Sequence, residues 1–331
     1  MAGVELITVE SGEAGMRLDR WFKVHFPGLG FGHLQKLLRS GQIRVSGARA
    51  KSDTRVEPGQ VVRVPPLGVD KAGGEAGGPM SMRAVRGGED ADVLAQMTLY
   101  EDDKVFVFNK PSGLAVQGGS GVTRHVDGML EALRNKKGEK PRLVHRLDRD
   151  TSGVLVVAKT RLAAMKLAEA FRGRDAQKTY WALVKGVPKQ RDGKISSWLV
   201  KEPTPEGDKV RIAKHGEDGA DHAVSHYRII EQAAQTLSWL EMEPHTGRTH
   251  QLRVHAVQIG CPIIGDPKYF EADTNWDFPG GMQNRLHLHA RRLRIPHPSG
   301  GMIDVTAPLP PHMRQSWNLL GFEDSAAGET E

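Results

Sequence analysis

The sequence predicts an α+β protein, with a large domain around a mixed, largely antiparallel β-sheet and a small basic α/β unit before it. Two observations predict the large domain: within residues 97–322, segments typical of strands outnumber helical ones, and few strand–helix–strand crossovers occur. A third, a Gly-rich stretch after residue 66, separates the two parts. With 331 residues, the chain is long enough for one large domain or two smaller ones.

The small unit is predicted for residues 1–66, with a core of about 15–64. "MRLDRWFKVHF" places Leu18, Trp21 and Phe22 at helical spacing, and "GHLQKLLRSG" is typical of a second helix that ends at a glycine. "QIRVSGARA" predicts a short strand and a turn, and "GQVVRVPP" predicts a further strand. A unit of this size lies near the lower limit of independent stability.

Positive charge is concentrated in this small unit. Ten Lys or Arg but only three Asp or Glu lie between Gly15 and Val64, whereas the whole chain carries a formal net charge of +6. The rest of the chain is therefore close to neutral. Such a distribution is typical of a module that binds a polyanion.

Residues 67–96 are predicted to be a flexible Gly-rich linker. Between Gly68 and Asp92 there are three Gly-Gly pairs and no aromatic residue, so this stretch has little apolar surface to offset the entropy of ordering. Residues 323–331, "EDSAAGETE" from position 323, are acidic and rich in small residues. We expect them to form a disordered tail.

The large domain is expected at 97–322. Its predicted helices are "RLAAMKLAEAFRG" and "THQLRVHAVQIG", which show helical spacing of apolar residues. Its predicted strands are, in chain order, "KVFVFNKPSG", "GVLVVAK", "KTYWALVKG" and a hairpin of "SHYRIIEQ" with "LSWLEMEP".

Several classes of protein are disfavoured. No apolar stretch approaches the length of a membrane span, and the N-terminus lacks the features of a signal peptide. The lone cysteine, Cys261, excludes an intramolecular disulfide and zinc sites built on paired cysteines, and it fits a cytoplasmic location. No phosphate-binding loop, G-x-S-x-G elbow or dinucleotide fingerprint occurs, so we expect no nucleotide cofactor.

The stretch "VHRLDRDTSGVLVVAKT" places Asp148 between two arginines and just before an apolar strand. Taken alone, the stretch is typical of a solvated Asp/Ser/Gly turn. The apolar residues on both sides favour a second interpretation, a carboxylate that an arginine keeps ionised beside the core, as in many active sites.

A second polar stretch, "HTGRTHQLRVH", places Arg248 and Arg253 near the start of a helix. Because cations there oppose the helix dipole, a phosphate or a buried carboxylate is expected to neutralise them. Its three histidines are five residues apart, which does not suit metal binding on a helix, so no metal site is predicted. Tyr180, His287 and His289 are, by default, residues of the core.

The motif "HRLDRDTSG" resembles the signature of the RluA/RluC/RluD family of pseudouridine synthases. Further blocks resemble the family's other motifs in the same order, over about Leu99 to Leu320. These blocks are "KPSG", "KTYWALVKG", "HTGRTHQLRVH", "GDPKY" and "LHLHARRL". The N-terminal unit resembles an S4 RNA-binding domain in "RLDRWF…LQKLLRSGQIRVSG".

The resemblance implies a pseudouridine synthase catalytic domain in which Asp148 is the catalytic aspartate, Tyr180 packs against the target uracil and Arg253 pairs with Asp148. Arg146 would hold or replace the flipped nucleotide. The other RNA contacts expected are His145, Lys110, Thr151, Arg248, His250 and Gln251 in the large domain, and Arg17, Arg20, Lys36, Arg39 and Arg44 in the S4-like unit.

The implied reaction, the isomerisation of uridine in RNA, needs no redox change or energy input, in keeping with the expected absence of a cofactor. The expected partner is large-subunit ribosomal RNA or its assembly intermediate. The protein is expected to act as a monomer and not to bind a membrane. The RluC type is favoured, with the RluD type, acting on a single stem-loop, or a transfer-RNA target as alternatives. Other classes considered are an S4-type RNA-binding assembly factor without catalysis and a metal-dependent hydrolase.

Overall fold

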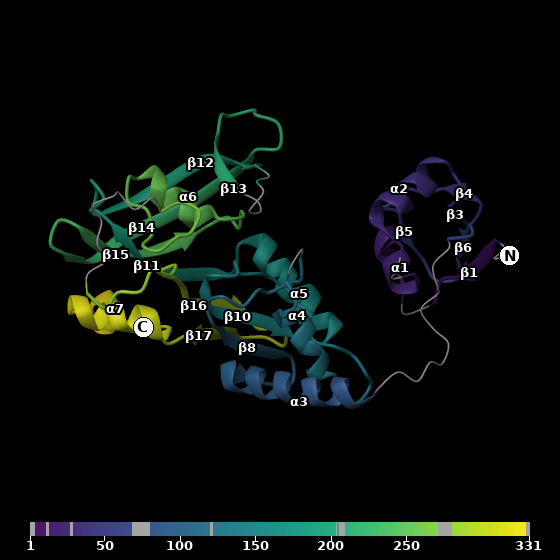
Figure 1. The fold of residues 1–331 in the computed structure, drawn as a ribbon, viewed down its shortest axis with the longest axis horizontal. Helices are drawn as coiled ribbons and strands as arrows, with labels where there is room; N and C mark the ends of the chain where they lie inside the picture. Colours follow the sequence, from purple (N-terminus) through teal and green to yellow (C-terminus); the bar gives the residue numbers. More distant parts are fainter. Residues whose placement is uncertain are drawn as a thin grey trace. The chain divides into compact units, whose positions relative to one another are not determined.

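The computed structural model describes residues 4–10, 13–26, 29–67, 80–119, 122–202, 204, 209–270 and 280–328. The chain divides into two compact units, Met1–Met80 and Ser81–Glu331 (Figure 1). Among the helices in these ranges, none is both long enough and apolar enough to cross a bilayer.

The first unit is a small α/β structure, and its predicted helices and strands are confirmed. Helix α1 (Leu18–His25) and helix α2 (Phe31–Arg39) accompany a sheet of order β1-β6-β3-β4. Its core contains Trp21, whose indole nitrogen donates to Glu13 at 3.0 Å. The strands are β1 (Glu5–Thr8), β2 (Met16–Arg17), β3 (Arg44–Val45), β4 (Ala48–Arg49), β5 (Arg55–Val56) and β6 (Val61–Val64), with β2 paired to β5.

Helix α3 (Met80–Met97) occupies the second half of the predicted linker. The prediction of a flexible segment at 67–96 is therefore wrong from residue 80 onward, and residues 68–79 lie outside the described residues. Leu94 is completely buried and Met97 nearly so, because both pack with Phe108 and Leu155 of the large domain. This long-range packing stabilises a helix that its glycine-rich sequence alone does not favour.

The large unit contains an 11-stranded sheet with the order β13-β12-β14-β15-β11-β16-β10-β8-β7, to which β17 and β9 attach at β16 and β10. β10 pairs with β16 in parallel, whereas the other named strand pairs are antiparallel, so the predicted mixed, largely antiparallel sheet is confirmed. Its strands are β7 (Thr98–Glu101), β8 (Val105–Lys110), β9 (Arg142–Leu143), β10 (Ser152–Ala158), β11 (Gln177–Lys185), β12 (Asp192–Glu202), β13 (Lys209–Ala213), β14 (Asp221–Ala233), β15 (Leu237–Pro244), β16 (Leu288–Pro296) and β17 (Met302–Thr306).

Helices cover this sheet on both faces (Figure 1). Helix α5 (Arg161–Gly173) packs on the Val154 and Val156 side of β10, whereas α3 and α4 (Val126–Met129) pack on the Leu155 side. Helix α6 (Gln251–Gln258) packs on the Ala182 side of β11. Helix α7 (Pro311–Leu320) covers the opposite side through Trp317, and the short helix η2 (Leu130–Leu133) follows α4.

The C-terminal segment differs from the disordered tail predicted at 323–331. Residues Asp324–Ala327 form a short 3-10 helix, η3, and residues 329–331 lie outside the described residues. Asp324 makes ion pairs with Arg291 at 3.4 Å and Arg314 at 2.8 Å, and Ala327 is buried. Tertiary contacts therefore hold a segment whose composition is typical of disorder.

Candidate active site

The loop that carries Asp148 joins β9 to β10 and is anchored on both sides of the carboxylate. On one side, the His145 Nε2 atom accepts a hydrogen bond from the backbone N–H of Val156 at 2.8 Å, and its ring stacks on Phe171. On the other side, the Lys110 ammonium donates to the backbone carbonyl of Arg149 at 3.0 Å. Asp148 therefore extends from a loop that is fixed before any substrate binds.

Lys110 lies inside the protein rather than on an RNA-binding surface. Its side chain is completely buried, and its ammonium donates to the carbonyl oxygens of Pro111, Leu114 and Arg149 at 2.9, 2.8 and 3.0 Å. Burial lowers the pKa of Lys110 to about 7, although nearby carboxylates oppose this shift. The predicted RNA contact for Lys110 is wrong, because the residue instead ties the end of β8 to the loop.

Gly153 lets this loop enter the sheet. It has a φ of 111°, and a Cβ atom at this position would lie 2.2 Å from the carbonyl oxygen of Ala290 on β16. Any side chain would separate β10 from β16 at the only parallel pairing between named strands in the described part of the chain. The glycine of the motif is therefore required by close packing of two backbones.

Asp148 faces a pair of nitrogen donors on helix α6 and its N-terminal flank. The side chain of Asp148 is 24% exposed, and its Oδ2 atom lies 3.3 Å from Nη1 of Arg253 and 3.8 Å from Nε2 of His250. A guanidinium at this distance makes a charge-assisted contact with the carboxylate. The structure thus brings together Asp148 and Arg253, which are 105 residues apart in the sequence.

Arg253 is itself held by a second carboxylate. It is 3% exposed, and its Nε and Nη2 atoms donate to Oδ2 and Oδ1 of Asp266 at 2.7 and 2.6 Å. Asp266 is also buried, so a two-point ion pair fixes the plane of the guanidinium and leaves Nη1 directed at Asp148. Sequence reasoning expected a phosphate or a buried carboxylate near these arginines but did not identify Asp266, which lies in the "GDPKY" block.

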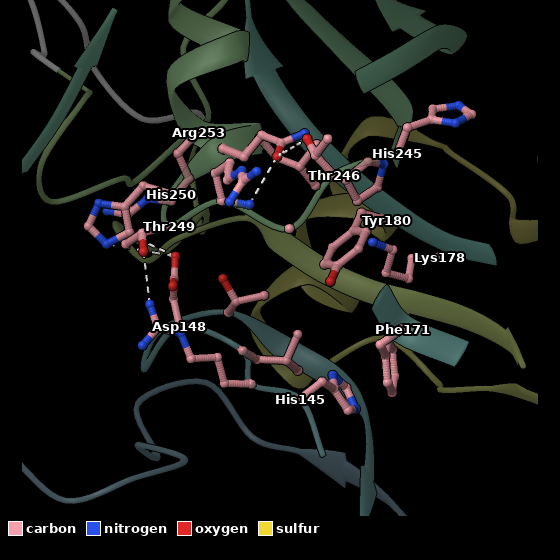
Figure 2. A pocket seen from close by; sticks show the side chains of 18 of the residues that line it. His145, Asp148, Phe171, Lys178, Tyr180, His245, Thr246, Thr249, His250 and Arg253 are labelled. Carbon is pink, nitrogen blue, oxygen red and sulfur yellow. Dashed lines mark hydrogen bonds and ion pairs between the residues drawn. The ribbon is translucent and has the colours of Figure 1, made fainter. Parts of the chain in front are cut away.

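Tyr180 extends from β11 into the same pocket (Figure 2). Its ring packs among apolar residues that include Met242 and Leu288. Burial, and then the negative charge of Asp148, raises the pKa of Tyr180 well above its usual value. The hydroxyl therefore remains protonated, and the ring offers an aromatic surface beside the carboxylate.

Sequence reasoning missed three basic residues of this pocket, Arg172, Arg174 and Lys178. Lys178 is two residues before Tyr180 on β11, so the two side chains share a face of the strand. This alternation of side chains along the strand was the signal that could have identified Lys178 as a pocket residue. Burial lowers the pKa of Lys178. Arg172 and Arg174 lie at the C-terminal end of α5, where cations are common for reasons unrelated to binding.

The pocket has a volume of about 590 Å³, within the range of small-molecule sites. Arg146 and Arg248 are exposed at its edge. The Arg146 guanidinium donates to the hydroxyl of Thr249 at 2.8 Å, and Arg248 lies 3.3 Å from Asp221. Thr151 also lines the pocket, although it is only 3% exposed.

Gln251 and His145 have structural roles, because their side chains are engaged in contacts within the protein. The amide of Gln251 donates to the backbone of Val224 and the hydroxyl of Ser225, and its carbonyl accepts from Thr246 and the backbone of Arg248. Gln251 is 4% exposed, so the predicted RNA contact is wrong for it. His145 lines the pocket, but its ring is occupied by the Val156 and Phe171 contacts, and burial lowers its pKa to about 3.

Within the described ranges, no group of three or more His, Cys, Asp or Glu side chains is arranged to hold a metal ion. His255 is completely buried, and its two ring nitrogens bond to Ser197 and Ser225 at 3.1 and 2.9 Å. His287 and His289 are also buried and hydrogen-bonded, as expected for residues of the core.

The basic residues predicted to contact RNA in the first unit all lie at its surface. Arg44 donates to the carbonyl oxygens of Gly41 and Gly47, and Arg17 forms an ion pair with Asp19 at 2.6 Å. These predicted residues are Arg17, Arg20, Lys36, Arg39 and Arg44, and all five are exposed.

Comparisons with known proteins agree with one another. Residues 104–258 match the model of the RNA pseudouridylate synthase family. The chain is 36% identical to Ribosomal large subunit pseudouridine synthase C of Escherichia coli K12 over 92% of its length and 93% of the relative's, and 36% identical to the protein of that name from Yersinia pestis over 98% and 97%. Among solved structures, Human RNA Pseudouridylate Synthase Domain Containing 4 is 29% identical with a TM-score of 0.60, over 72% of this chain and 98% of that one.

Proposed function

Since the chain belongs to the RNA pseudouridylate synthase family, we propose that its substrate is large-subunit ribosomal RNA and that Asp148 is the carboxylate that reacts with the target uridine. The enzyme is an isomerase: the bond from C1′ to N1 of uridine breaks, a bond from C1′ to C5 forms, and the hydrogen on C5 is replaced by one on N1. The single observation that supports Asp148 is its position in the pocket, 3.3 Å from Arg253 and in the same pocket as Tyr180.

The pocket supplies what this reaction requires. An ionised carboxylate can attack C1′ as a nucleophile or remove a proton from C2′ as a base, and Arg253 contacts this carboxylate and orients it in either role. The target base must leave the RNA stack, which costs a few kcal/mol. Packing of the uracil on the Tyr180 ring offsets part of this cost, since stacking on an aromatic ring stabilises a base by about 1–3 kcal/mol.

The cations around the pocket are available to bind the RNA that flanks the flipped uridine. Arg146 and Arg248 are exposed at the edge, and Arg172, Arg174 and Lys178 line the wall. We assign Arg146, which lies two residues before Asp148, to fill the space that the flipped nucleotide leaves in the RNA. The other four are assigned to phosphates, whose contacts set register and affinity rather than sequence preference.

The proposed target follows from the relatives, which are named as large-subunit ribosomal enzymes and which the chain matches over nearly its whole length. This match extends across the basic first unit, so an RluC-type enzyme with residues 1–66 as an S4-like RNA-binding domain is favoured. The test is to map pseudouridines in ribosomal and transfer RNA from cells that lack the gene. We expect loss at large-subunit positions that the gene restores. Loss confined to transfer RNA would contradict the ribosomal target, and loss at one stem-loop alone would indicate the RluD type.

The basic first unit should provide affinity without chemistry. Replacing Arg20, Lys36 and Arg39 by Gln removes three exposed positive charges that lie outside the pocket. We expect weaker binding of ribosomal RNA fragments and a slope of log affinity against log salt that falls by about 0.7 to 0.9 for each phosphate that the variant no longer neutralises. Once RNA is saturating, the rate of pseudouridine formation should remain close to that of the wild type.

The matched control replaces Lys136, Lys137 and Lys189 by Gln. These side chains are exposed and do not line the pocket, and the change in net charge is the same. Binding is measured by titration at several salt concentrations. Equal decreases in affinity for the two triple variants would mean that only net charge matters, and the assignment of the first unit to RNA binding would fail.

A further inference from the structure

His250 lies between Asp148 and a half-buried tyrosine in an uncommon backbone conformation. It precedes helix α6 with a φ of 52°, in the left-handed region. Its Nδ1 atom lies 2.8 Å from the hydroxyl oxygen of Tyr269, and its Nε2 atom lies 3.8 Å from Oδ2 of Asp148. Figure 2 shows the ring on the same side of the pocket as Asp148. The imidazole thus contacts a fixed hydroxyl with one nitrogen and faces the reactive carboxylate with the other.

The hydrogen bonds of Tyr269 determine which nitrogen of His250 carries the proton. The Tyr269 oxygen accepts a hydrogen bond from the backbone N–H of Val210 at 2.8 Å. Its own hydroxyl hydrogen then needs an acceptor, and Nδ1 of His250 is the one that the described residues provide. With the Tyr269 hydroxyl as donor, Nδ1 is the acceptor and carries no proton. In a neutral imidazole the proton must therefore be on Nε2.

The Asp148 side of the ring leads to the same tautomer. A hydrogen on Nε2 is directed at the carboxylate, whereas a lone pair there would face a negative charge. Burial, with Arg253 and Lys268 contributing, lowers the pKa of His250 to about 4, although Asp148 and Asp266 oppose the shift. The ring is thus neutral at physiological pH. The 3.8 Å separation is longer than a hydrogen bond, as is common in an active site without its substrate.

One short loop positions both donors that face Asp148. Asp266 accepts from the backbone N–H groups of Lys268 and Tyr269 at 2.9 and 3.2 Å while it holds Arg253. The guanidinium of Arg253 also lies over the Tyr269 ring, 5.0 Å from its centre. Loop 266–269 therefore fixes Arg253 through a carboxylate and His250 through a phenol.

We propose that His250 is a positioning residue for the reaction: Tyr269 fixes it as the neutral Nε2–H tautomer, and with Arg253 it holds Oδ2 of Asp148 so that Oδ1 is directed to the uridine. Both groups near the carboxylate approach the same oxygen, and among the described residues no hydrogen bond or ion pair to Oδ1 is found. This role rests on the proposed reaction of Asp148, and it replaces the direct RNA contact expected for His250.

Two amide substitutions separate this role from a merely structural one. In His250→Gln the side-chain N–H₂ can reach the position of Nε2, whereas in His250→Asn it can reach only that of Nδ1. Asn adopts left-handed backbone more readily than Gln, so the fold alone would favour Asn at this position. We expect kcat of the Gln variant to stay within a few-fold of the wild type. For Asn we expect a decrease of about 10- to 100-fold with little change in KM for ribosomal RNA.

A measurement on the wild-type protein tests the tautomer without any assay of activity. Nitrogen NMR of the full chain at pH 7 should show His250 protonated on Nε2, and Tyr269→Phe should produce a mixture of tautomers. Asp148→Asn should lower the pKa of His250 further, since the carboxylate favours the charged ring. A proton on Nδ1, or equal decreases of kcat in the Gln and Asn variants, would overturn the proposal. Absence of pseudouridine formation by the wild type would instead refute the proposed function, and the NMR result would still decide the tautomer.

Discussion

Asp148→Asn is expected to abolish pseudouridine formation while leaving the fold and RNA binding intact. The amide has nearly the shape of the carboxylate but neither its charge nor its nucleophilicity, so it cannot attack C1′ or accept a proton from C2′. We expect the single-turnover rate on a ribosomal RNA fragment to fall by at least about 10³-fold. The fold should persist because Arg253 keeps its two-point ion pair with Asp266 when Asp148 is neutral.

The matched control is Asp150→Asn, two residues away on the same loop. The Asp150 side chain is 36% exposed and lies 3.9 Å from Arg149, outside the set of residues that line the pocket. The Asp150→Asn substitution removes the same charge from the same loop, and we expect the variant to retain most of the activity. A wild-type rate in Asp148→Asn would show that the carboxylate does not react. Equal decreases in both variants would point to loop charge rather than to one reactive group.

The sequence allowed prediction of elements whose signal is local. Three patterns are each complete within about a dozen residues: the apolar run of β10, the helical spacing of α5 and the alternation of β11. The structure has a strand or helix where each pattern predicts one. The candidate site itself followed from a resemblance spread over several blocks. Periodicity alone left Asp148 as an ordinary charged turn and Tyr180 as core.

What the sequence did not reveal depends on contacts between distant segments. Leu94 is an isolated leucine in a Gly-rich stretch, and its burial is visible only once the surface formed by Phe108 and Leu155 exists. Lys110 resembles any lysine at the end of a strand until three carbonyl oxygens surround its ammonium. A buried carboxylate such as Asp266 gives no periodic signal. Polar residues whose partners lie far along the chain are therefore where pattern reasoning fails.

A second large effect is expected on stability, which should fall steeply as the pH drops from about 6.5 toward 4. His255, His287 and His289 are completely buried, and burial lowers their pKa values to about 4, 4 and 3, with nearby cations adding to the effect for His287 and His289. In the unfolded chain each would have a pKa near 6.5. Between these pKa values the unfolded chain binds protons that the folded protein does not. The stability that these neutral histidines allow is therefore complete above pH 6.5 and decreases as the pH falls toward their folded-state pKa values.

Each such histidine lowers the free energy of unfolding by about 1.4 kcal/mol per pH unit in this window, so these three contribute about 4 kcal/mol per pH unit, and His145 and His250, whose pKa values burial also lowers to about 3 and about 4, add to this slope. Since domains are stable by only about 5–15 kcal/mol, we expect acid unfolding to be complete near pH 4. Urea unfolding at several pH values measures the slope, which His255→Gln should reduce by about 1.4 kcal/mol per pH unit. His215→Gln, at an exposed position, should leave it unchanged. A slope that no buried histidine alters would assign the acid sensitivity to carboxylates such as Asp324, whose salt bridges hold a depressed pKa in the folded state.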